Sequence, residues 1–131
     1  MKLIIDTSAA VAIMTGEREG GRMIEHLDAA SIRQMSVASY VELAIVLEAK
    51  FGPIGVTLAD RFVRDAGIEV VSVDAEQGQR AAVAWRRFGK GRHPAGLNFG
   101  DCFVYGLAET NEAKILCVGN DFVHTDITVA R

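Results

Sequence analysis

MKLIIDTS (residues 1–8) is the stretch of sequence that decides the fold. Residues 2–5 are a short apolar run, which predicts a buried strand, and the Asp6-Thr7-Ser8 that follows is typical of the start of a helix. A strand that passes directly into a helix is the repeating unit of α/β proteins. Ligands of such proteins bind at the carboxyl ends of the parallel strands, so Asp6 marks the edge where a functional site is expected.

The same alternation of apolar runs and helical patterns continues along the chain. Further strands are expected at residues 32–36, 68–73 and 114–118, with a short last strand at residues 127–129. Helices are expected at residues 9–14, 20–27, 37–50, 56–66, 75–88 and 99–111, and three of them follow a capping residue, Ser36, Asp74 or Asn98. Apolar strands separated by helices predict an α/β fold whose mostly parallel sheet is covered on both faces.

The composition predicts a single domain that spans residues 1–131. Hydrophobic residues make up 50% of the chain, charged residues 24%, and the net charge is −3, which excludes a disordered protein. Residues 3–14 are too short to cross a bilayer and are interrupted by Asp6, so no membrane anchor or export signal is expected. Cys102 and Cys117 lie in apolar surroundings without C-x-x-C spacing, which favours buried thiols in the cytoplasm.

Four apolar segments each contain a single charged residue, and in every case it is an acid. These acids are Asp6 within residues 3–14, Glu42 within 37–47, Asp101 within 97–108 and Asp121 within 115–123. Each follows a predicted strand or lies in the first turns of a predicted helix, so all four can meet at one edge of the sheet. Carboxylates that share a pocket repel each other, and none of these segments supplies a lysine or arginine. Such hard oxygen ligands favour Mg²⁺ or Mn²⁺, and the three histidines lack the spacing of a zinc site.

Each acid also has a purely structural interpretation. Asp6 can cap the helix after it, Asp101 can favour the dipole of its own helix, and Asp121 can be a turn residue. Glu42 completes the capping-box pattern S-x-x-E that begins at Ser39, but it lies well inside the helix if Ser36 is the true cap. The occurrence of all four acids in the same kind of segment is what favours a shared functional site.

In this order and spacing, the acidic motifs resemble those of PIN-domain ribonucleases, and among them the VapC-type toxins of bacterial toxin–antitoxin pairs. The resemblance covers essentially the whole chain and rests on Ile4-Ile5-Asp6-Thr7-Ser8, on Glu42, on Asn98-Phe99-Gly100-Asp101-Cys102-Phe103 and on Gly119-Asn120-Asp121-Phe122. It implies a three-layer α/β/α fold and Mg²⁺- or Mn²⁺-dependent hydrolysis of RNA phosphodiester bonds. It also implies a cognate antitoxin that neutralises the enzyme, and a homodimer.

The resemblance further implies the residue roles. Asp6, Glu42, Asp101 and Asp121 would be the catalytic, metal-binding acids. Thr7 and Ser8 would lie beside the metal and hold Asp6 or water in place. Asp126 is either a rival of Asp121 or a neighbour that supports the metal ligands, and we favour Asp121 because it directly follows a predicted strand.

A basic stretch precedes the Asp101 motif and is the candidate RNA-binding surface. It contains no acid between its six cationic or titratable residues, which are Arg80, Arg86, Arg87, Lys90, Arg92 and His93. An acidic site repels a polyanion, so a nearby basic stripe would attract the RNA backbone, although a solvated helix face is the simpler interpretation. Trp85 and Phe88 share an apolar helical stripe with Ala81, which predicts that both aromatic rings pack into the core.

Two other functions fit parts of the pattern. One is a non-catalytic PIN-like protein-binding module, in which an arginine of the chain or of a partner permanently neutralises the acids. The other is a metal-dependent phosphatase with Asp6 as nucleophile, but such enzymes carry a second acid two residues later, and Ser8 stands there instead.

Overall fold

The computed structural model describes residues 1–130. Four strands form one parallel sheet in the order β3-β2-β1-β4, where β1 is Lys2–Ile5, β2 is Ile32–Ser36, β3 is Glu69–Val71 and β4 is Lys114–Leu116. In the register of the sheet, Ile4 of β1 lies opposite Gln34 of β2 and Ile115 of β4. The predicted parallel α/β sheet is therefore confirmed.

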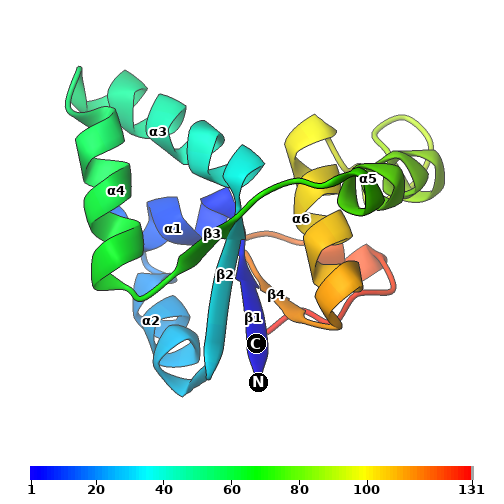
Figure 1. Cartoon of the computed structure of the whole chain (residues 1–131), viewed down its shortest axis with the longest axis horizontal. Coiled ribbons are helices and arrows are strands. Elements are labelled where there is room, and N and C mark those ends of the chain that lie inside the picture. Colours follow the sequence, from blue (N-terminus) through cyan, green and yellow to red (C-terminus); the bar gives the residue numbers. More distant parts are fainter. Residues whose placement is uncertain (131) are drawn as a thin grey trace.

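Helices cover both faces of this sheet, which confirms the three-layer arrangement (Figure 1). The helices are α1 (Thr7–Met14), α2 (Gly20–Ala29), α3 (Val37–Phe51), α4 (Gly55–Asp65), α5 (Ala75–Phe88) and α6 (Phe99–Asn111), and a 3₁₀ turn, η1, covers Phe122–His124. Leu3 and Ile5 pack into the apolar cluster with α1–α4, whereas Ile4 packs into the cluster with α5 and α6. Alternate residues of a strand point to opposite faces, so β1 joins the two halves of the core.

Side-chain caps begin the helices as the sequence predicts. Ser36 accepts a hydrogen bond from Ala38 N at 3.2 Å, and Asp74 accepts one from Gln77 N at 2.8 Å. Because Ser36 is the cap of α3, Glu42 lies in the second turn of this helix and is no part of a capping box. In the part of the chain that the structure describes, no helix is both long and apolar enough to cross a bilayer.

The last strands differ from the prediction. The strands expected at residues 68–73 and 114–118 shorten to Glu69–Val71 and Lys114–Leu116. β4 ends early because the backbone N–H of Val118 donates to the hydroxyl of Ser8 instead of to a strand partner. The strand expected at residues 127–129 is reduced to a single bridge between Val129 and Ile115.

The prediction that both aromatic residues of α5 pack into the core is half wrong. Phe88 is buried, but Trp85 keeps 41% of its surface exposed. The indole ring folds over the end of its own helix, so closely that a Cβ atom on Gly89 would lie 2.5 Å from Trp85 Cε3. Trp85 therefore belongs to the surface between α5 and α6.

Candidate active site at the carboxyl edge of the sheet

The structure brings the four predicted acids to the carboxyl edge of the sheet, the edge at which β1 and β2 end in Figure 1. Asp6 follows β1, Glu42 lies in α3, Asp101 lies in the first turn of α6, and Asp121 lies between β4 and η1. The charges of Asp6, Asp121 and Glu42 all raise the pKa of Asp101, so these four groups share one electrostatic environment.

Asp6 is the most deeply buried of these acids. Only 6% of its surface is exposed, and burial is the main reason why its pKa is raised above the ordinary value; the charge of Glu42 adds to this shift. Ser8 works in the opposite direction, since its backbone N–H donates to Asp6 Oδ2 at 3.0 Å and its hydroxyl donates to the same oxygen. The Ser8 oxygen in turn accepts from Val118 N at 3.0 Å, so Ser8 fastens Asp6 to the end of β4.

Thr7 connects a second pair of elements at this edge. Its hydroxyl donates to the carbonyl oxygen of Ser39 at 3.2 Å, which joins the start of α1 to the first turn of α3. Thr7 therefore anchors the helix that carries Glu42, whereas Ser8 contacts the carboxylate of Asp6 itself.

Glu42 and Asp101 are brought together by Gly100. A Cβ atom on residue 100 would lie only 3.0 Å from Glu42 Oε2, so the absence of a side chain lets the Glu42 carboxylate lie against the first turn of α6. The neighbouring Asp101 forms a capping box with Asn98: Asp101 N donates to Asn98 Oδ1 at 2.9 Å, and Asn98 N donates to Asp101 Oδ2 at 3.0 Å. Glu42 thus comes within the range at which its charge acts on Asp101.

Burial and like charge together raise the pKa of Asp101 to about 6. Burial contributes most, the charges of Asp6, Asp121 and Glu42 add to it, and the hydrogen bond from Asn98 N opposes it. The capping role and the electrostatic role of Asp101 therefore coexist in one side chain.

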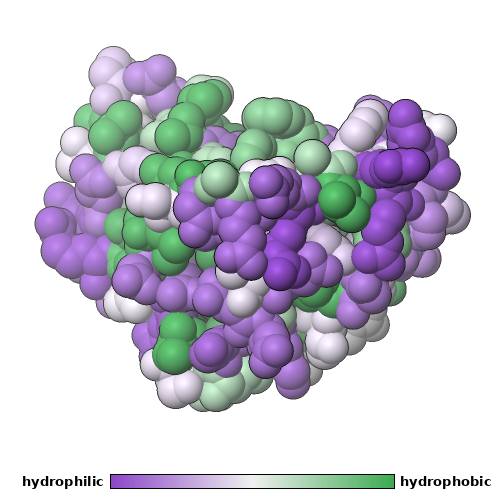
Figure 2. All heavy atoms as spheres, turned by 45° about the vertical axis from the view of Figure 1, so that its right-hand side comes forward, coloured by the Kyte–Doolittle hydropathy of each residue, from purple (hydrophilic) through white to green (hydrophobic). Residues whose placement is uncertain are grey.

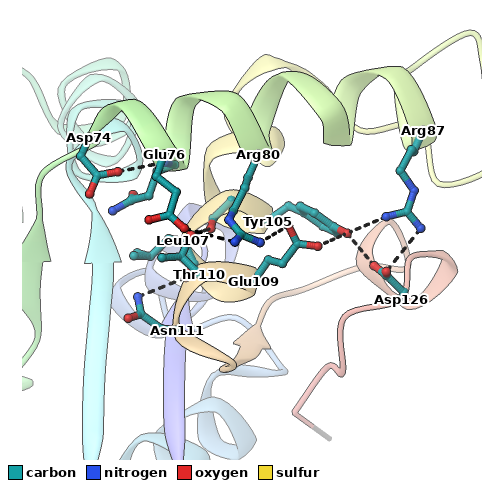
Figure 3. A network of polar contacts seen from close by, with 12 residues as sticks. Asp74, Glu76, Arg80, Arg87, Tyr105, Leu107, Glu109, Thr110, Asn111 and Asp126 are labelled. Atoms are coloured by element: carbon teal, nitrogen blue, oxygen red, sulfur yellow. Dashed lines mark hydrogen bonds and ion pairs between the residues drawn. The ribbon is translucent and has the colours of Figure 1, made fainter.

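Asp126 lies in a different network, which joins the segment after η1 to α5 and α6 (Figure 3). Tyr105 donates its hydroxyl hydrogen to Asp126 Oδ1 at 2.7 Å, and Arg87 donates to Asp126 Oδ2 at 3.3 Å. Burial first, and then the hydrogen bond to Asp126, raise the pKa of Tyr105, which keeps its hydroxyl protonated as the donor. Of the two rival acids, Asp121 is the one whose charge acts on Asp101.

Half of the predicted RNA-binding residues have partners within the protein. Arg80 pairs with Glu76 at 3.1 Å and with Glu109 at 3.0 Å, and Arg87 pairs with Asp126 (Figure 3). His93 accepts a hydrogen bond from Ala95 N through Nδ1, and its ring contacts Phe88 edge-on at 5.0 Å between centroids. These three residues therefore make contacts within the fold, at α5 and the loop after it.

The other three basic residues, Arg86, Lys90 and Arg92, are exposed. None of them forms an ion pair with any residue in the range 1–130. Over the same range, no lysine, arginine or histidine lies within 4.0 Å of a carboxylate oxygen of the four clustered acids. Residues 1–130 therefore supply no cation to neutralise the acidic site.

The donor set of this site fits a hard divalent cation, because all its charged side chains are carboxylates and Gly100 leaves room for one of them to approach another. Among residues 1–130, no three His, Cys, Asp or Glu side chains are close enough to form a complete ligand set. Mg²⁺ commonly takes one or two carboxylates and fills its other positions with water, so a closed protein cage is not required.

Two residues that shape the site, Val118 and Gly100, escaped the sequence analysis in this role. The contact of Ser8 with Val118 joins positions 110 residues apart, and the approach of Glu42 to Gly100 joins two helices, so neither has a local signal. A glycine directly before Asp101, where a helix begins, is the one clue that the sequence offers.

Comparison with known protein families and curated proteins gives full-length matches. The family model of the PIN domain matches residues 3–127. Ribonuclease VapC30 of Mycobacterium tuberculosis is 48% identical over 129 residues, which cover 98% of each chain. Ribonuclease VapC of Mycolicibacterium smegmatis is 45% identical over 125 residues, which cover 95% of this chain and 97% of that protein.

Solved structures agree with this fold. The toxin VapC20 of Mycobacterium tuberculosis, described as cleaving the sarcin–ricin loop, superposes with a TM-score of 0.80 at 16% identity and covers 99% of both chains. A chain of VapBC2 from Rickettsia felis, solved bound to a promoter DNA fragment, gives a TM-score of 0.71 at 14% identity over 99% of this chain and 98% of that one. The chain therefore belongs to the PIN domain family and, within that family, to the VapC group.

Proposed function

We propose that this protein is a Mg²⁺- or Mn²⁺-dependent endoribonuclease, the toxin of a toxin–antitoxin pair. The observation that carries the proposal is a set of four acids at the carboxyl edge of the sheet, without a neutralising cation among residues 1–130. The relatives named as VapC ribonucleases support the same activity. The alternative of a module whose acids are neutralised by an arginine within residues 1–130 lacks support, since the ion-paired arginines of this range, Arg80 and Arg87, bind other acids.

The residues of the site would have two kinds of role, metal binding and orientation of the metal ligands. Asp6, Glu42, Asp101 and Asp121 would hold one or two divalent cations, which supply activated water and offset the negative charge that develops on the phosphate. Ser8 fixes the orientation of Asp6 through two hydrogen bonds. The capping box with Asn98 fixes Asp101 in the same way, so both carboxylates are oriented before RNA arrives.

Chelation tests this proposal directly. Purified protein is expected to cleave total cellular RNA in the presence of Mg²⁺ or Mn²⁺, to lose this activity in excess chelator, and to regain it when either metal is restored. Sequencing of the new RNA ends maps the cleavage sites, and we expect 5′-phosphate and 3′-hydroxyl products. Cleavage that persists at the same sites in chelator would contradict a metal-dependent mechanism.

The RNA-binding proposal rests on the exposed, unpaired cations Arg86, Lys90 and Arg92. The double variant Lys90→Ala with Arg92→Ala is expected to weaken RNA binding and to make it less dependent on salt. Each neutralised phosphate of single-stranded RNA releases about 0.7 counterions, so the slope of log K against log salt concentration should become smaller by roughly 1.4. Binding is measured by titration in chelator at several salt concentrations.

A matched control for this pair removes two exposed cations from helices that pack on the other half of the core, Lys50 of α3 and Arg64 of α4. Replacing both with alanine changes the net charge equally and is expected to leave the salt slope unchanged. If the salt slopes of both double variants equalled that of the wild type, Lys90 and Arg92 would not belong to the RNA-binding surface.

The proposed partners are an antitoxin and a second copy of the chain, both in the cytoplasm. Val37, Val41 and Ile45 are exposed at successive turns of α3, and such an apolar stripe is suited to a helix–helix interface. Figure 2 shows apolar residues along the upper edge of the lobe that carries α3 and α4, beside a notch in the surface. An arginine from an antitoxin arm that enters the acidic site would neutralise it.

A further inference from the structure

A pocket of about 600 Å³ lies between α5 and α6 and is not part of the acidic site. Its volume falls within the roughly 300–1,000 Å³ of small-molecule sites. Its floor on α5 consists of small residues, including Gly78 and Ala82, and its walls are Trp85, Phe99 and Phe103. A Cβ atom on Gly78 would meet nothing within 4 Å, so this groove remains open because α5 carries no large side chain there.

The aromatic walls contact neighbouring residues, although Trp85 and Phe99 are exposed. Trp85 lies against the backbone of Gly89, where any side chain would collide with the indole. Phe99 keeps 80% of its surface exposed, and its ring contacts Phe103 edge-on at 4.8 Å between centroids. The indole of Trp85, packed against Gly89, offers a flat apolar face that needs little ordering when a planar ligand binds, and the exposed ring of Phe99 offers a second face.

The pocket adjoins the acidic site through the start of α6. Asn98 and Phe99 line the pocket, and Asn98 exchanges two hydrogen bonds with Asp101 at 2.9 and 3.0 Å. Lys90, also in the lining, brings a positive charge without an ion-pair partner among residues 1–130. Aromatic faces, a cation and a neighbouring phosphate-processing site together match the chemistry of a nucleotide.

We propose that this pocket binds an unstacked nucleobase of the RNA substrate, next to the nucleotide whose phosphate lies at the acidic site. This inference rests on the proposed ribonuclease function and extends it to how the enzyme selects RNA. The base stacks against the aromatic walls, and Lys90 contacts the backbone phosphate beside it. Single-stranded or looped RNA is then the preferred substrate, because a paired base cannot enter.

Trp85 is the only tryptophan of the chain, so its fluorescence reports directly on the pocket. The full-length protein in chelator is titrated with hexaribonucleotides of adenine, uracil or cytosine, and with a matched hexamer that has the same sugar-phosphate backbone but no bases. We expect at least one base-containing hexamer to quench Trp85, and the abasic hexamer to bind weakly without quenching.

Two variants challenge the pocket in different ways. Phe99→Ala removes a stacking wall and is expected to weaken binding roughly five- to hundredfold, the range associated with loss of a base–aromatic stack. Gly78→Leu fills the groove while replacing a helix-interior glycine, so it should weaken binding similarly but raise the melting temperature. Val83→Ala is the matched control, because Val83 is also exposed on α5 but borders a different hollow with Glu76 and Glu109.

The outcomes separate this inference from the proposed function. If the wild type cleaves RNA with metal but Gly78→Leu binds and cleaves every hexamer as the wild type does, the pocket is not a base site and the ribonuclease proposal stands. If Gly78→Leu disturbs only self-association or antitoxin binding, the pocket is a protein interface and the inference is wrong. If no metal-dependent cleavage occurs at all, the function itself fails, whatever the fluorescence shows.

Discussion

Asp101→Asn is expected to lower the rate of RNA cleavage by roughly a thousandfold, the scale on which a single catalytic group acts. Asparagine keeps the shape of the side chain and can still accept the hydrogen bond from Asn98 N, so α6 retains its cap. What disappears is one negative charge from the four-acid site. Asp6→Asn should have a comparable effect for the same reason. Initial cleavage rates with saturating Mg²⁺, together with melting curves of each variant, measure both effects.

Asp121→Asn and Asp126→Asn form a matched pair that tests the fourth acid. The charge of Asp121 acts on Asp101, whereas Asp126 is bound by Tyr105 and Arg87. We expect Asp121→Asn to lose most of its cleavage, and Asp126→Asn to keep it while losing some stability. The reverse result would transfer the role to Asp126, and full activity in all four variants would reject the acidic site as the catalytic centre.

The fold could be predicted largely because its signals are local. The apolar run of β1 and the caps at Ser36, Asp74 and Asn98 lie next to the elements that they define. Strand ends were less predictable. β4 stops where the backbone N–H of Val118 donates to the hydroxyl of Ser8, and this contact forms only in the folded sheet. An apolar run defines where a strand can exist but not how far its hydrogen-bonded partner extends.

The candidate site was predictable in its acids and less so in its surroundings. A lone carboxylate in an apolar segment is visible in the sequence, because burial of an unneutralised charge is costly enough to require a reason. Glu109 as a partner of Arg80, and Asp126 as the partner of Arg87, were not visible, because they lie on α6 and on the segment after β4, and only the packing of α5 brings them together. Trp85 was wrongly assigned to the core, since helical spacing alone does not reveal that its ring turns back onto Gly89.

In the absence of divalent metal, Asp101→Asn is expected to be more stable than the wild type at neutral pH by about 1–2 kcal/mol, after allowance for partial exposure of this carboxyl to solvent. The pKa of Asp101 in the folded protein is about 6, above the ordinary value of 3.8, so the folded state holds the proton more tightly than the unfolded state does. Asp101 therefore contributes stability at low pH, and the protein loses this contribution as the pH rises from about 4 through about 6. Asparagine does not titrate, so the variant does not lose stability at this position as the pH rises.

Divalent metal should reverse the order of stability at neutral pH. A cation that binds only the folded state stabilises it by mass action, by about 2.7 kcal/mol at a hundredfold excess over its dissociation constant, and the wild type retains the full set of acids to bind it. Denaturant unfolding at pH 4 and pH 7.5, with chelator and with Mg²⁺ or Mn²⁺, measures the free energy of unfolding of both proteins in each condition. We expect Asp101→Asn to be the more stable protein at pH 7.5 in chelator, and the wild type to be the more stable protein at pH 7.5 with metal. At pH 4 the two stabilities should differ least.

An Asp65→Asn control on α4, outside the acidic site, should have the same stability as the wild type in every condition. If the wild type were more stable than Asp101→Asn at pH 7.5 in chelator, neither burial nor the neighbouring acids would disfavour the ionised carboxylate of Asp101, and the physical reason for placing a cation at this site would be lost.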